Sequence, residues 1–424
     1  MQTKAHCQTV LFVSNGHGED TVGAQIARRV QVFAGDRLRL LAFPIVGAGN
    51  PYRQAGIPVV GPQAQLPSGG FGYLNIRNAI RDVLAGGVGM ALRQLRFAWR
   101  HRDEWDAVVG VGDRVSLHLN DRILKKPMIW VAIAYSIRFV PPGGRFGSPG
   151  RWRPLLDDKV EAFVRDVDTQ AALKAMGYPS RYVGNPMRDG LEPNPETRRR
   201  VELALRASGW DGSSPVVALL PGSRKDALLN LPGQLEVFKI LYNETGGRIA
   251  GIVAWAPLDT TGTLAEVLKR AGWILQVGSD RHGQSWQAGA GEGVAFLADG
   301  SDRGPMVPLV RQAFPEILDL CTVVLGQAGT AVEQAVGLGK PAVTFPGKGM
   351  QVTPRFLAAQ GRLLRGAVVV SDPAPQAVAR EVLGILADPE RYRTMAETGR
   401  RLMGLPGATD AIARRIVERF ALEI

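Results

Sequence analysis

Cysteine is almost absent from this chain of 424 residues, which has only Cys7 and Cys321. Two cysteines so far apart provide no disulfide framework, and their scarcity is typical of a reducing compartment. Apolar runs are also short, and none approaches the ~20 residues that a membrane-spanning helix needs. The first run ends in "SNGHGED", where glycines and acids interrupt it, so we interpret it as a strand and not a signal peptide.

Several motifs for metals and nucleotides are missing. The five histidines are scattered, and no H-x-x-H or paired-cysteine spacing occurs. The glycines of residues 14–29, "SNGHGEDTVGAQIARR", do not match the dinucleotide spacing G-x-G-x-x-G, and the chain has no P-loop. We therefore expect no metal and no bound cofactor.

Negative charge is scarce in the first half of the chain. Residues 1–190 contain 25 Lys+Arg against 15 Asp+Glu, so they carry most of the formal net charge of +12. This asymmetry indicates an anionic partner, either nucleic acid or a membrane surface, although a solvated basic face has the same composition. No nucleic-acid-binding motif is recognisable, which favours the membrane.

Short β-branched apolar runs alternate with helical stretches along the whole chain. Runs without polar alternation, separated by helices, predict parallel sheets covered on both faces. The pattern pauses at "NPMRDGLEPNPETRRR", which is rich in proline and charge. The fold class expected is α/β, with two doubly wound, Rossmann-like domains facing across a cleft. The domains span residues 1–190 and 191–402, and a last helix within 403–424 could cross back to the first domain.

Ligands of such folds bind at the carboxyl ends of the strands, so residues that follow strands are the candidate site. The stretch "GQAGTAVEQAVGLGKPAVTFP", residues 326–346, follows one strand with Gln327, Gly329 and Thr330. Free N–H groups at the start of the next helix would hold phosphate oxygens, and Glu333 could accept hydrogen bonds from a ribose diol. Thr330 and Glu333 are also spaced as a capping box, and the two roles need not exclude one another.

Two further strand ends offer polar groups to the same ligand. In "VVALLPGSRKDALLNLP", Gly222 lets the backbone approach, Ser223 offers donors, and Arg224 could clamp a diphosphate. Lys348 and Gln351 follow the run "PAVTFP" and could reach the sugar or the phosphates, or could belong to an ordinary polar loop.

The first domain contains the candidates for proton transfer. Asp113 follows the strand "DAVVGVG", where an aspartate is also a common helix cap. His17 is the rival base, since an unperturbed pKa of ~6.5 suits proton acceptance. Glu19 and Asp20 could orient an acceptor or His17, or could stabilise a helix N-terminus.

Together these motifs resemble a known family of two-domain glycosyltransferases of the GT-B type. Residues 326–346 look like the nucleotide-sugar half of such enzymes, for example the one that makes lipid II. The motifs "LLPGSR" at 219–224, "VGNPMRD" at 183–189 and the D-x-x-G-A of Asp20 to Ala24 resemble lipid-A-disaccharide synthase. The likeness spans both domains in the same order.

The chain also departs from that synthase on the acceptor side. Gly18, Glu19 and Asp20 stand where the synthase has Ser-Gly-Asp. The text "VVGVGDRVSLHLN" replaces an acidic, proline-containing segment with a catalytic aspartate, so Asp113 is the nearest candidate. The resemblance therefore implies nucleotide-sugar use more firmly than lipid A chemistry.

The resemblance implies an inverting, metal-independent glycosyltransferase. It would move a sugar such as N-acetylglucosamine from UDP to a lipid-linked acceptor, as in lipid A biosynthesis, on the cytoplasmic face of the cell membrane. A UDP-sugar 2-epimerase shares the architecture and is one alternative. A non-catalytic homologue that binds a nucleotide or a lipid is the other.

Two segments of the first domain are the expected membrane contacts. Residues 76–102 combine six arginines with Phe97 and Trp99, and residues 135–153 add more arginines with Phe139 and Trp152. Basic residues beside aromatic anchors are typical of helices that lie in the lipid headgroup region. The same residues would also suit a helix that packs its apolar face on the sheet and solvates its arginines.

Overall fold

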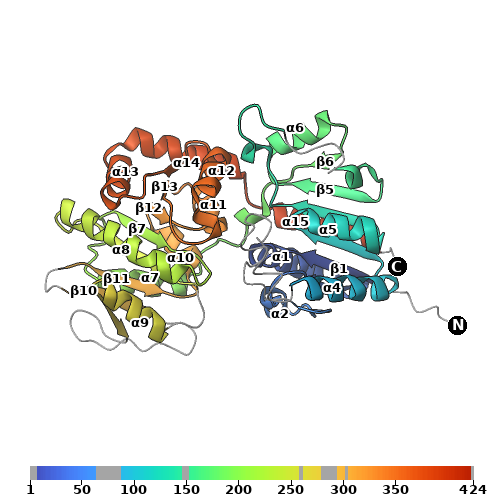
Figure 1. The fold of residues 1–424 in the computed structure, drawn as a ribbon, viewed down its shortest axis with the longest axis horizontal. Coiled ribbons are helices and arrows are strands. Elements are labelled where there is room, and N and C mark those ends of the chain that lie inside the picture. The colour runs from blue at the N-terminus through green and yellow to red at the C-terminus, as the bar shows by residue number, and fades with distance from the viewer. Residues whose placement is uncertain are drawn as a thin grey trace. The chain divides into compact units, whose positions relative to one another are not determined.

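The computed structural model describes residues 7–63, 87–145, 152–256, 261–277, 294–300 and 304–421. The chain separates into two compact units, one of residues 1–190 with 404–424 and the other of residues 191–403. Each unit is a sheet with helices on both faces (Figure 1). The α/β class with two doubly wound, Rossmann-like sheets is thus confirmed.

The first unit is built on a parallel six-stranded sheet in the order β2-β1-β3-β4-β5-β6. Nearly every side chain of β1 to β5 is buried, because helices cover both faces. The strands are β1 Gln8–Ser14, β2 Leu38–Pro44, β3 Ala107–Val111, β4 Met128–Ala132, β5 Val160–Val164 and β6 Ser180–Arg181. The α-helices described are α1 His17–Ala34, α2 Asn50–Gln54, α4 Gly87–His101, α5 Arg114–Leu119, α6 Val167–Ala175 and α15 Ala408–Phe420.

The second unit has an eight-stranded sheet in the order β14-β13-β12-β7-β8-β11-β10-β9. Its strands are β7 Val216–Leu220, β8 Ala250–Ala254, β9 Trp273–Val277, β10 Val294–Asp299, β11 Met306–Val310, β12 Val323–Gly326, β13 Ala342–Thr344 and β14 Val368–Val370. Its α-helices are α7 Pro195–Ala207, α8 Ala227–Glu244, α9 Thr261–Arg270, α10 Phe314–Leu320, α11 Thr330–Gly337, α12 Pro354–Leu364, α13 Pro375–Ala387 and α14 Pro389–Met403.

One edge of this second sheet differs from the parallel arrangement that the sequence predicts. Strand β10 pairs antiparallel with both β9 and β11, while the other pairs are parallel. The apolar runs of β9 and β10 have a composition similar to that of the runs that form parallel strands. Composition therefore does not show whether a strand pairs parallel or antiparallel.

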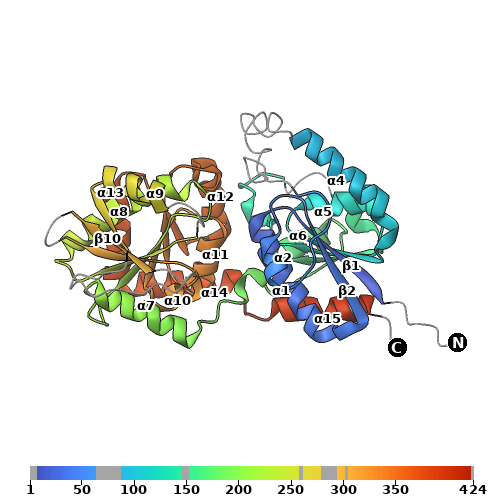
Figure 2. The ribbon, with the colours of Figure 1, turned by 90° about the horizontal axis from the view of Figure 1, so that it is seen from below.

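The last helix belongs to the first unit, where α15 lies beside α1 (Figure 2). Arg29 of α1 donates to Asp410 of α15 through two nitrogens, the longer bond being 2.7 Å. Asp189 accepts hydrogen bonds of 2.6 Å from the N–H groups of Gly407 and Thr409, where α15 begins. The aspartate of "VGNPMRD" thus fixes the returning chain.

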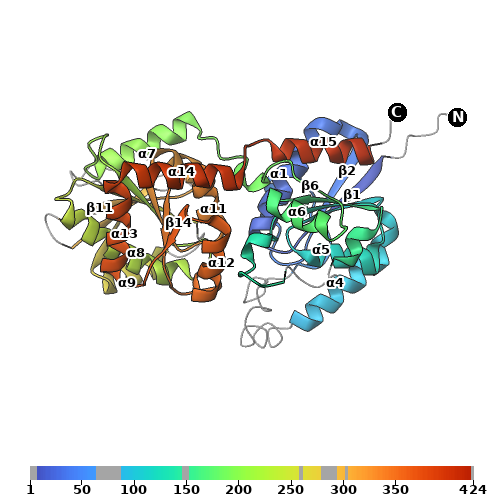
Figure 3. The same ribbon diagram turned by 90° about the horizontal axis from the view of Figure 1, so that it is seen from above.

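In the second unit, α14 packs against α11 (Figure 3). Gly399 of α14 makes this contact possible, because a Cβ there would overlap the backbone oxygen of Val336 in α11. The close approach holds α11, and therefore its N-terminal end, in a fixed position at the edge of the sheet.

Candidate functional site

Both sheets reverse their strand order at one point, and ligands of open α/β sheets bind outside the carboxyl ends of the strands there. In the first unit the reversal lies between β1 and β3, and in the second it lies between β7 and β12. The residues after these four strands are 15–20, 112–114, 221–224 and 327–330. Nearly all the candidate residues lie in or near these segments.

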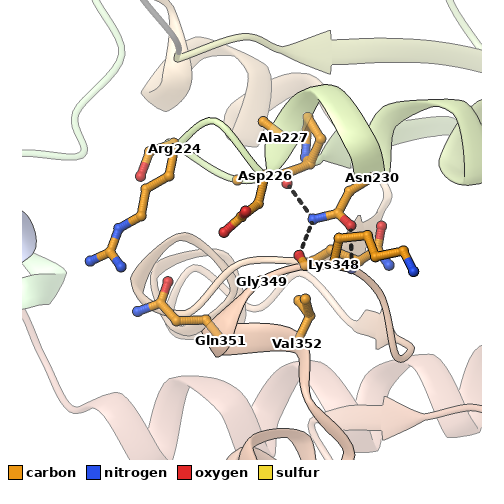
Figure 4. Close-up of a pocket in the computed structure, with 12 residues that line it drawn as sticks. Arg224, Asp226, Ala227, Asn230, Lys348, Gly349, Gln351 and Val352 are labelled. Atoms are coloured by element: carbon orange, nitrogen blue, oxygen red, sulfur yellow. Dashed lines mark hydrogen bonds between the residues drawn. The ribbon is translucent and has the colours of Figure 1, made fainter. Parts of the chain in front are cut away.

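A pocket that is partly open to solvent lies at the reversal point of the second unit (Figure 4). The loop after β7, the loop after β12 and the loop after β13 meet there. Six candidates share this pocket: Gly222, Ser223, Arg224, Gln327, Lys348 and Gln351. The other lining residues are Pro221, Asp226, Ala227, Asn230, Gly349 and Val352.

Asn230 joins two of these loops from the first turn of α8. Its Nδ2 donates to the carbonyl oxygens of Pro221 at 3.3 Å and Lys348 at 3.0 Å, and its Oδ1 accepts from the Lys348 N–H at 2.8 Å (Figure 4). The side chain is buried, so each of these bonds replaces one to water. Asn230 therefore sets the separation of the two loops.

Gln327 holds the pocket from the β12 side. Its buried amide donates to the carbonyl oxygens of Phe345 at 3.3 Å and Pro346 at 3.4 Å, while its Oε1 has no hydrogen-bond partner among the described residues. Gly347 packs directly on this amide, since a Cβ there would overlap Gln327 Nε2. The pocket wall is thus made of backbone and buried amides.

Glycine is required where the chain bends around the pocket. Gly222 has φ +113 and Gly349 has φ +108, a region that other residues rarely adopt. A Cβ on Gly349 would also overlap the carboxylate of Asp226. The Arg224 side chain extends beside Gln351 (Figure 4), and burial lowers the pKa of its guanidinium.

Helix α11 begins beside this pocket, and the capping-box interpretation of its first turn is wrong. The N-cap position is Gly329, which has no side chain to cap the helix, and the N–H of Glu333 bonds to the Gly329 carbonyl oxygen at 3.3 Å. Thr330 is already inside the helix, so its hydroxyl is not placed as a cap. Gln351 covers Gly329 closely, because a Cβ there would lie 2.9 Å from Gln351 Nε2. Glu333 is buried.

The acids of the first unit converge at its reversal point. Asp113 caps α5 by accepting from the N–H of Val115 at 2.8 Å, and its other oxygen accepts from Asn15 Nδ2 at 2.7 Å. The backbone N–H of Asn15 donates to Glu19 at 2.7 Å, so one residue bridges both carboxyl groups. Glu19 packs on Gly112, where a Cβ would overlap its carboxyl carbon.

Burial dominates the ionisation of this acid pair. It raises the pKa of Glu19 well above its usual value, and the charge of Asp113 raises it further. Burial also raises the pKa of Asp113, while hydrogen bonds from Val115 and Asn15 oppose the rise. Two adjacent carboxyl groups that resist double ionisation can hold one proton between them.

Asp20 lies deeper, at the end of a buried hydrogen-bond chain. Tyr52 OH donates to Ser14 Oγ at 3.2 Å, and Ser14 Oγ donates to Asp20 Oδ1 at 2.6 Å. Gly23 provides the room, since a Cβ there would overlap the Tyr52 hydroxyl. Burial raises the pKa of Asp20 to about 7. The aspartate and glycine of D-x-x-G-A thus build one internal chain of polar groups.

His17 is the first residue of α1, and its side chain lies outside the described part of the structure. Sequence reasoning missed Asn15, Tyr52, Asp226 and Asn230. A polar residue inside the apolar run "ALLNLP" was the available signal for Asn230. Nothing local marks Tyr52, because its role depends on the fold. Within the described ranges, no group of three or more His, Cys, Asp or Glu could hold a metal ion.

The two segments expected at the membrane are described in part, since residues 76–86 and 146–151 lie outside the described ranges. Trp152 is 1% exposed and packs against Trp130, so its expected role as a membrane anchor is wrong. Phe97 packs against Phe43 of the core. No helix within the described ranges is both long and apolar enough to cross a membrane.

No protein-family model matches this chain, and no curated protein matches it in sequence. Solved structures do match its fold. MnaA of S. aureus, solved with UDP, gives a TM-score of 0.62 at 11% identity over 97% of this chain and 96% of that chain. A putative UDP-N-acetylglucosamine 2-epimerase from Listeria monocytogenes gives 0.60 at 13% identity over 97% and 96%. MurG of Acinetobacter baumannii gives 0.54 at 14% identity over 97% and 99%. The chain therefore has the GT-B fold.

Proposed function

We propose that the protein is an inverting, metal-independent glycosyltransferase that uses a UDP-sugar and resembles lipid-A-disaccharide synthase in its sequence motifs. The observation that carries the proposal is the pocket where the loops after β7, β12 and β13 meet at the reversal point of the second sheet. Structures of the same fold bind UDP, as the S. aureus example states. Arg224, Lys348 and the first N–H groups of α11 would hold the diphosphate.

The donor half would work without a metal ion. The guanidinium of Arg224 and the backbone N–H groups at Gly222, Ser223 and the start of α11 can stabilise charge on a departing diphosphate. The rigid wall provided by Asn230 and Gln327 keeps these groups in place before the donor binds. Such preorganisation lowers the cost of stabilising the transition state.

The acceptor half would need one base. Asp113 is our assignment, since it lies just after β3 with its carboxylate held by Asn15 and Val115. Glu19 and Asp113 together bind a proton more tightly than an isolated carboxyl group, so the pKa of the base would lie closer to neutral pH. The acceptor is proposed to be lipid-linked, with an N-acetylglucosamine-type sugar as the transferred group.

A UDP-sugar 2-epimerase is the second candidate function. The acid cluster favours it, because epimerisation needs groups that remove and return a proton, and Glu19, Asp20 and Asp113 lie together at one sheet end. Three of the structures with the same fold are described as UDP-N-acetylglucosamine 2-epimerases, one of them as a putative one.

Incubation with UDP-N-acetylglucosamine and a lipid extract separates these functions. Transfer to lipid, measured with radiolabelled sugar, supports the glycosyltransferase. Conversion of the sugar at C2 without transfer, measured by NMR of the nucleotide sugar, supports the epimerase. Binding of UDP without either reaction would contradict both and favour a non-catalytic homologue.

Glu333→Ala tests the donor site directly. We expect UDP affinity to fall at least tenfold, because a hydrogen bond to a charged group contributes on the order of 1.5–3 kcal/mol and every ~1.4 kcal/mol is a factor of ten in affinity. Isothermal titration calorimetry with UDP measures the loss, and thermal unfolding is followed in parallel. Glu202→Ala, on α7 and paired with Arg206, is the control and should bind UDP normally. A Glu333 variant that only melts earlier would contradict a ribose contact.

We further propose that α4 attaches the first unit to an anionic membrane. Four apolar side chains with helical spacing are solvent-exposed on one face of α4: Val88 53%, Leu92 62%, Leu95 43% and Trp99 58%. Exposed arginines lie next to this stripe at positions 93, 96 and 100. A neighbouring face is buried, with Gln94 at 5% and Ala98 at 0% exposure. An apolar stripe beside cations is typical of helices that lie in the headgroup region.

Membrane binding should depend both on ionic strength and on the exposed apolar side chains of α4. Each arginine near an anionic surface contributes about 1 kcal/mol, so three would give clear binding at low ionic strength and weak binding at high. We expect cosedimentation with phosphatidylserine liposomes in low salt, abolished in a Leu92→Gln, Leu95→Gln, Trp99→Gln variant. A Leu203→Gln, Leu229→Gln variant removes two exposed leucines of the second unit and should still sediment. Equal loss in both variants would refute the role of α4.

A further inference from the structure

Arg114 follows the proposed base and has no role in the function described so far. It is the first residue of α5, and its Nε donates to the hydroxyl of Tyr135 at 2.8 Å. Its guanidinium also lies over two aromatic rings, 5.1 Å from the centre of Tyr135 and 5.6 Å from the centre of Trp152. The Arg114 side chain is therefore held by a hydrogen bond at Nε and by contact of its guanidinium with two aromatic rings.

The rings that hold Arg114 are themselves fixed. Trp152 contacts Tyr135 edge-on at 5.4 Å between ring centres and Trp130 at 6.1 Å. Trp130 is fully buried and donates from its indole nitrogen to the carbonyl oxygen of Asp113 at 3.1 Å. The aromatic cluster thus ties the orientation of Arg114 to the same backbone that positions the base.

Within the described ranges no carboxylate forms a direct ion pair with this arginine, although its charge opposes the rise in the pKa of Asp113. Asp113 is its neighbour in sequence, but the oxygens of that carboxylate accept from Val115 and Asn15. Among described residues, no carboxylate lies within ion-pair distance of Arg114, and its two terminal nitrogens have no hydrogen-bond acceptor. The side chain is partly exposed, so these nitrogens can reach a ligand.

We propose that Arg114 binds a phosphate group of the acceptor, with its two free terminal nitrogens donating to two phosphate oxygens. The guanidinium fork matches phosphate geometry, and an arginine that is already oriented loses little conformational entropy on binding. The position next to Asp113 would set the distance between the phosphate and the hydroxyl that attacks the sugar. Calling the ligand an acceptor rests on the proposed function, whereas the phosphate site itself does not.

Binding of small phosphate probes tests the site. Isothermal titration with dihexanoyl phosphatidic acid, dihexanoyl phosphatidylcholine and inorganic phosphate is carried out with excess UDP, which occupies the anion-binding groups of the second unit. If UDP itself does not bind, the proposed function fails, and the titrations are repeated in an Arg224→Gln background. Failure of the proposed function and failure of the phosphate site are thereby distinguished.

We expect Arg114→Gln to weaken phosphatidic acid binding at least tenfold, with phosphatidylcholine weak in both proteins. Arg122→Gln is the matched control, because this neighbouring arginine is 81% exposed and pairs with Asp121, and it should leave affinity unchanged. Tyr135→Phe removes the anchor of Nε and should weaken binding several-fold even if Arg114→Gln fails to fold.

The probes also identify the source of the phosphate. Tighter binding of phosphatidic acid than of inorganic phosphate indicates a lipid headgroup, and equal binding indicates recognition of the phosphate alone. Either result supports the site. Unchanged affinity in both Arg114→Gln and Tyr135→Phe, or no binding of any phosphate probe to the unaltered protein, would overturn it.

Discussion

Asp113→Asn is expected to slow sugar transfer by about a hundredfold or more while UDP affinity stays unchanged. General base catalysis typically contributes 10²–10⁴-fold, and an amide cannot accept the proton. The local structure should survive, since the asparagine oxygen can still accept from the N–H of Val115 and the neighbouring Asn15 amide can rotate to match. Release of UDP under saturating donor measures the rate.

Asp121→Asn is a matched control for this experiment, as this aspartate lies a few residues further on and pairs with exposed Arg122. Its turnover should be normal. His17→Ala is the decisive comparison, because His17 is the rival base. Intact turnover in Asp113→Asn together with its loss in His17→Ala would show that our assignment of the base is wrong.

Replacing Asp20 with asparagine should change how stability depends on pH. Burial raises the pKa of Asp20 from 3.8 to about 7, so between these values the folded protein keeps a proton that the unfolded chain releases. The free energy of unfolding therefore falls as pH rises from about 4 to about 7. The full effect is on the order of 4 kcal/mol, at ~1.36 kcal/mol per pKa unit.

In the Asp20→Asn variant this contribution disappears, since an amide does not ionise. We expect the variant to lose less stability than the unaltered protein between pH 4 and pH 7, measured by urea unfolding at a series of pH values. Asp36→Asn, at an exposed aspartate, should keep the original slope. Identical slopes in the unaltered protein and the Asp20 variant would rule out a buried, protonated Asp20.

The fold was predictable from sequence because continuous apolar runs mark strands that are buried on both faces. The run of β11, "MVPLV", was not predicted as a strand, since proline within a run argues against a strand. In the structure Pro308 nevertheless lies within β11, opposite Phe296 of the antiparallel strand β10. The short β14 was missed as well. Strand direction at that edge could not be inferred, since it depends on which neighbour a strand meets in space.

Six of the nine candidate donor residues line one pocket, because the loops after parallel strands gather at one edge of the sheet. The capping box failed for a local reason, since α11 takes Gly329 as its N-cap and so includes Thr330. The role of Asn230 was missed and that of Trp152 was predicted wrongly because both depend on tertiary contacts. Asn230 bonds to Lys348, 118 positions away, and Trp152 is buried against Trp130 of β4 and Tyr135, which follows that strand.

The packing of α15 on α1 means that the second unit is an insertion within the first. Synthesis on the ribosome then has a fixed order of events. Residues 191–403 form a contiguous segment and can fold as soon as they emerge, whereas the first unit must wait for residues 404–421, the last to be translated among its parts. Until that moment the surface of α1 that receives α15 is uncovered, and the nascent chain has a complete second unit and an incomplete first unit.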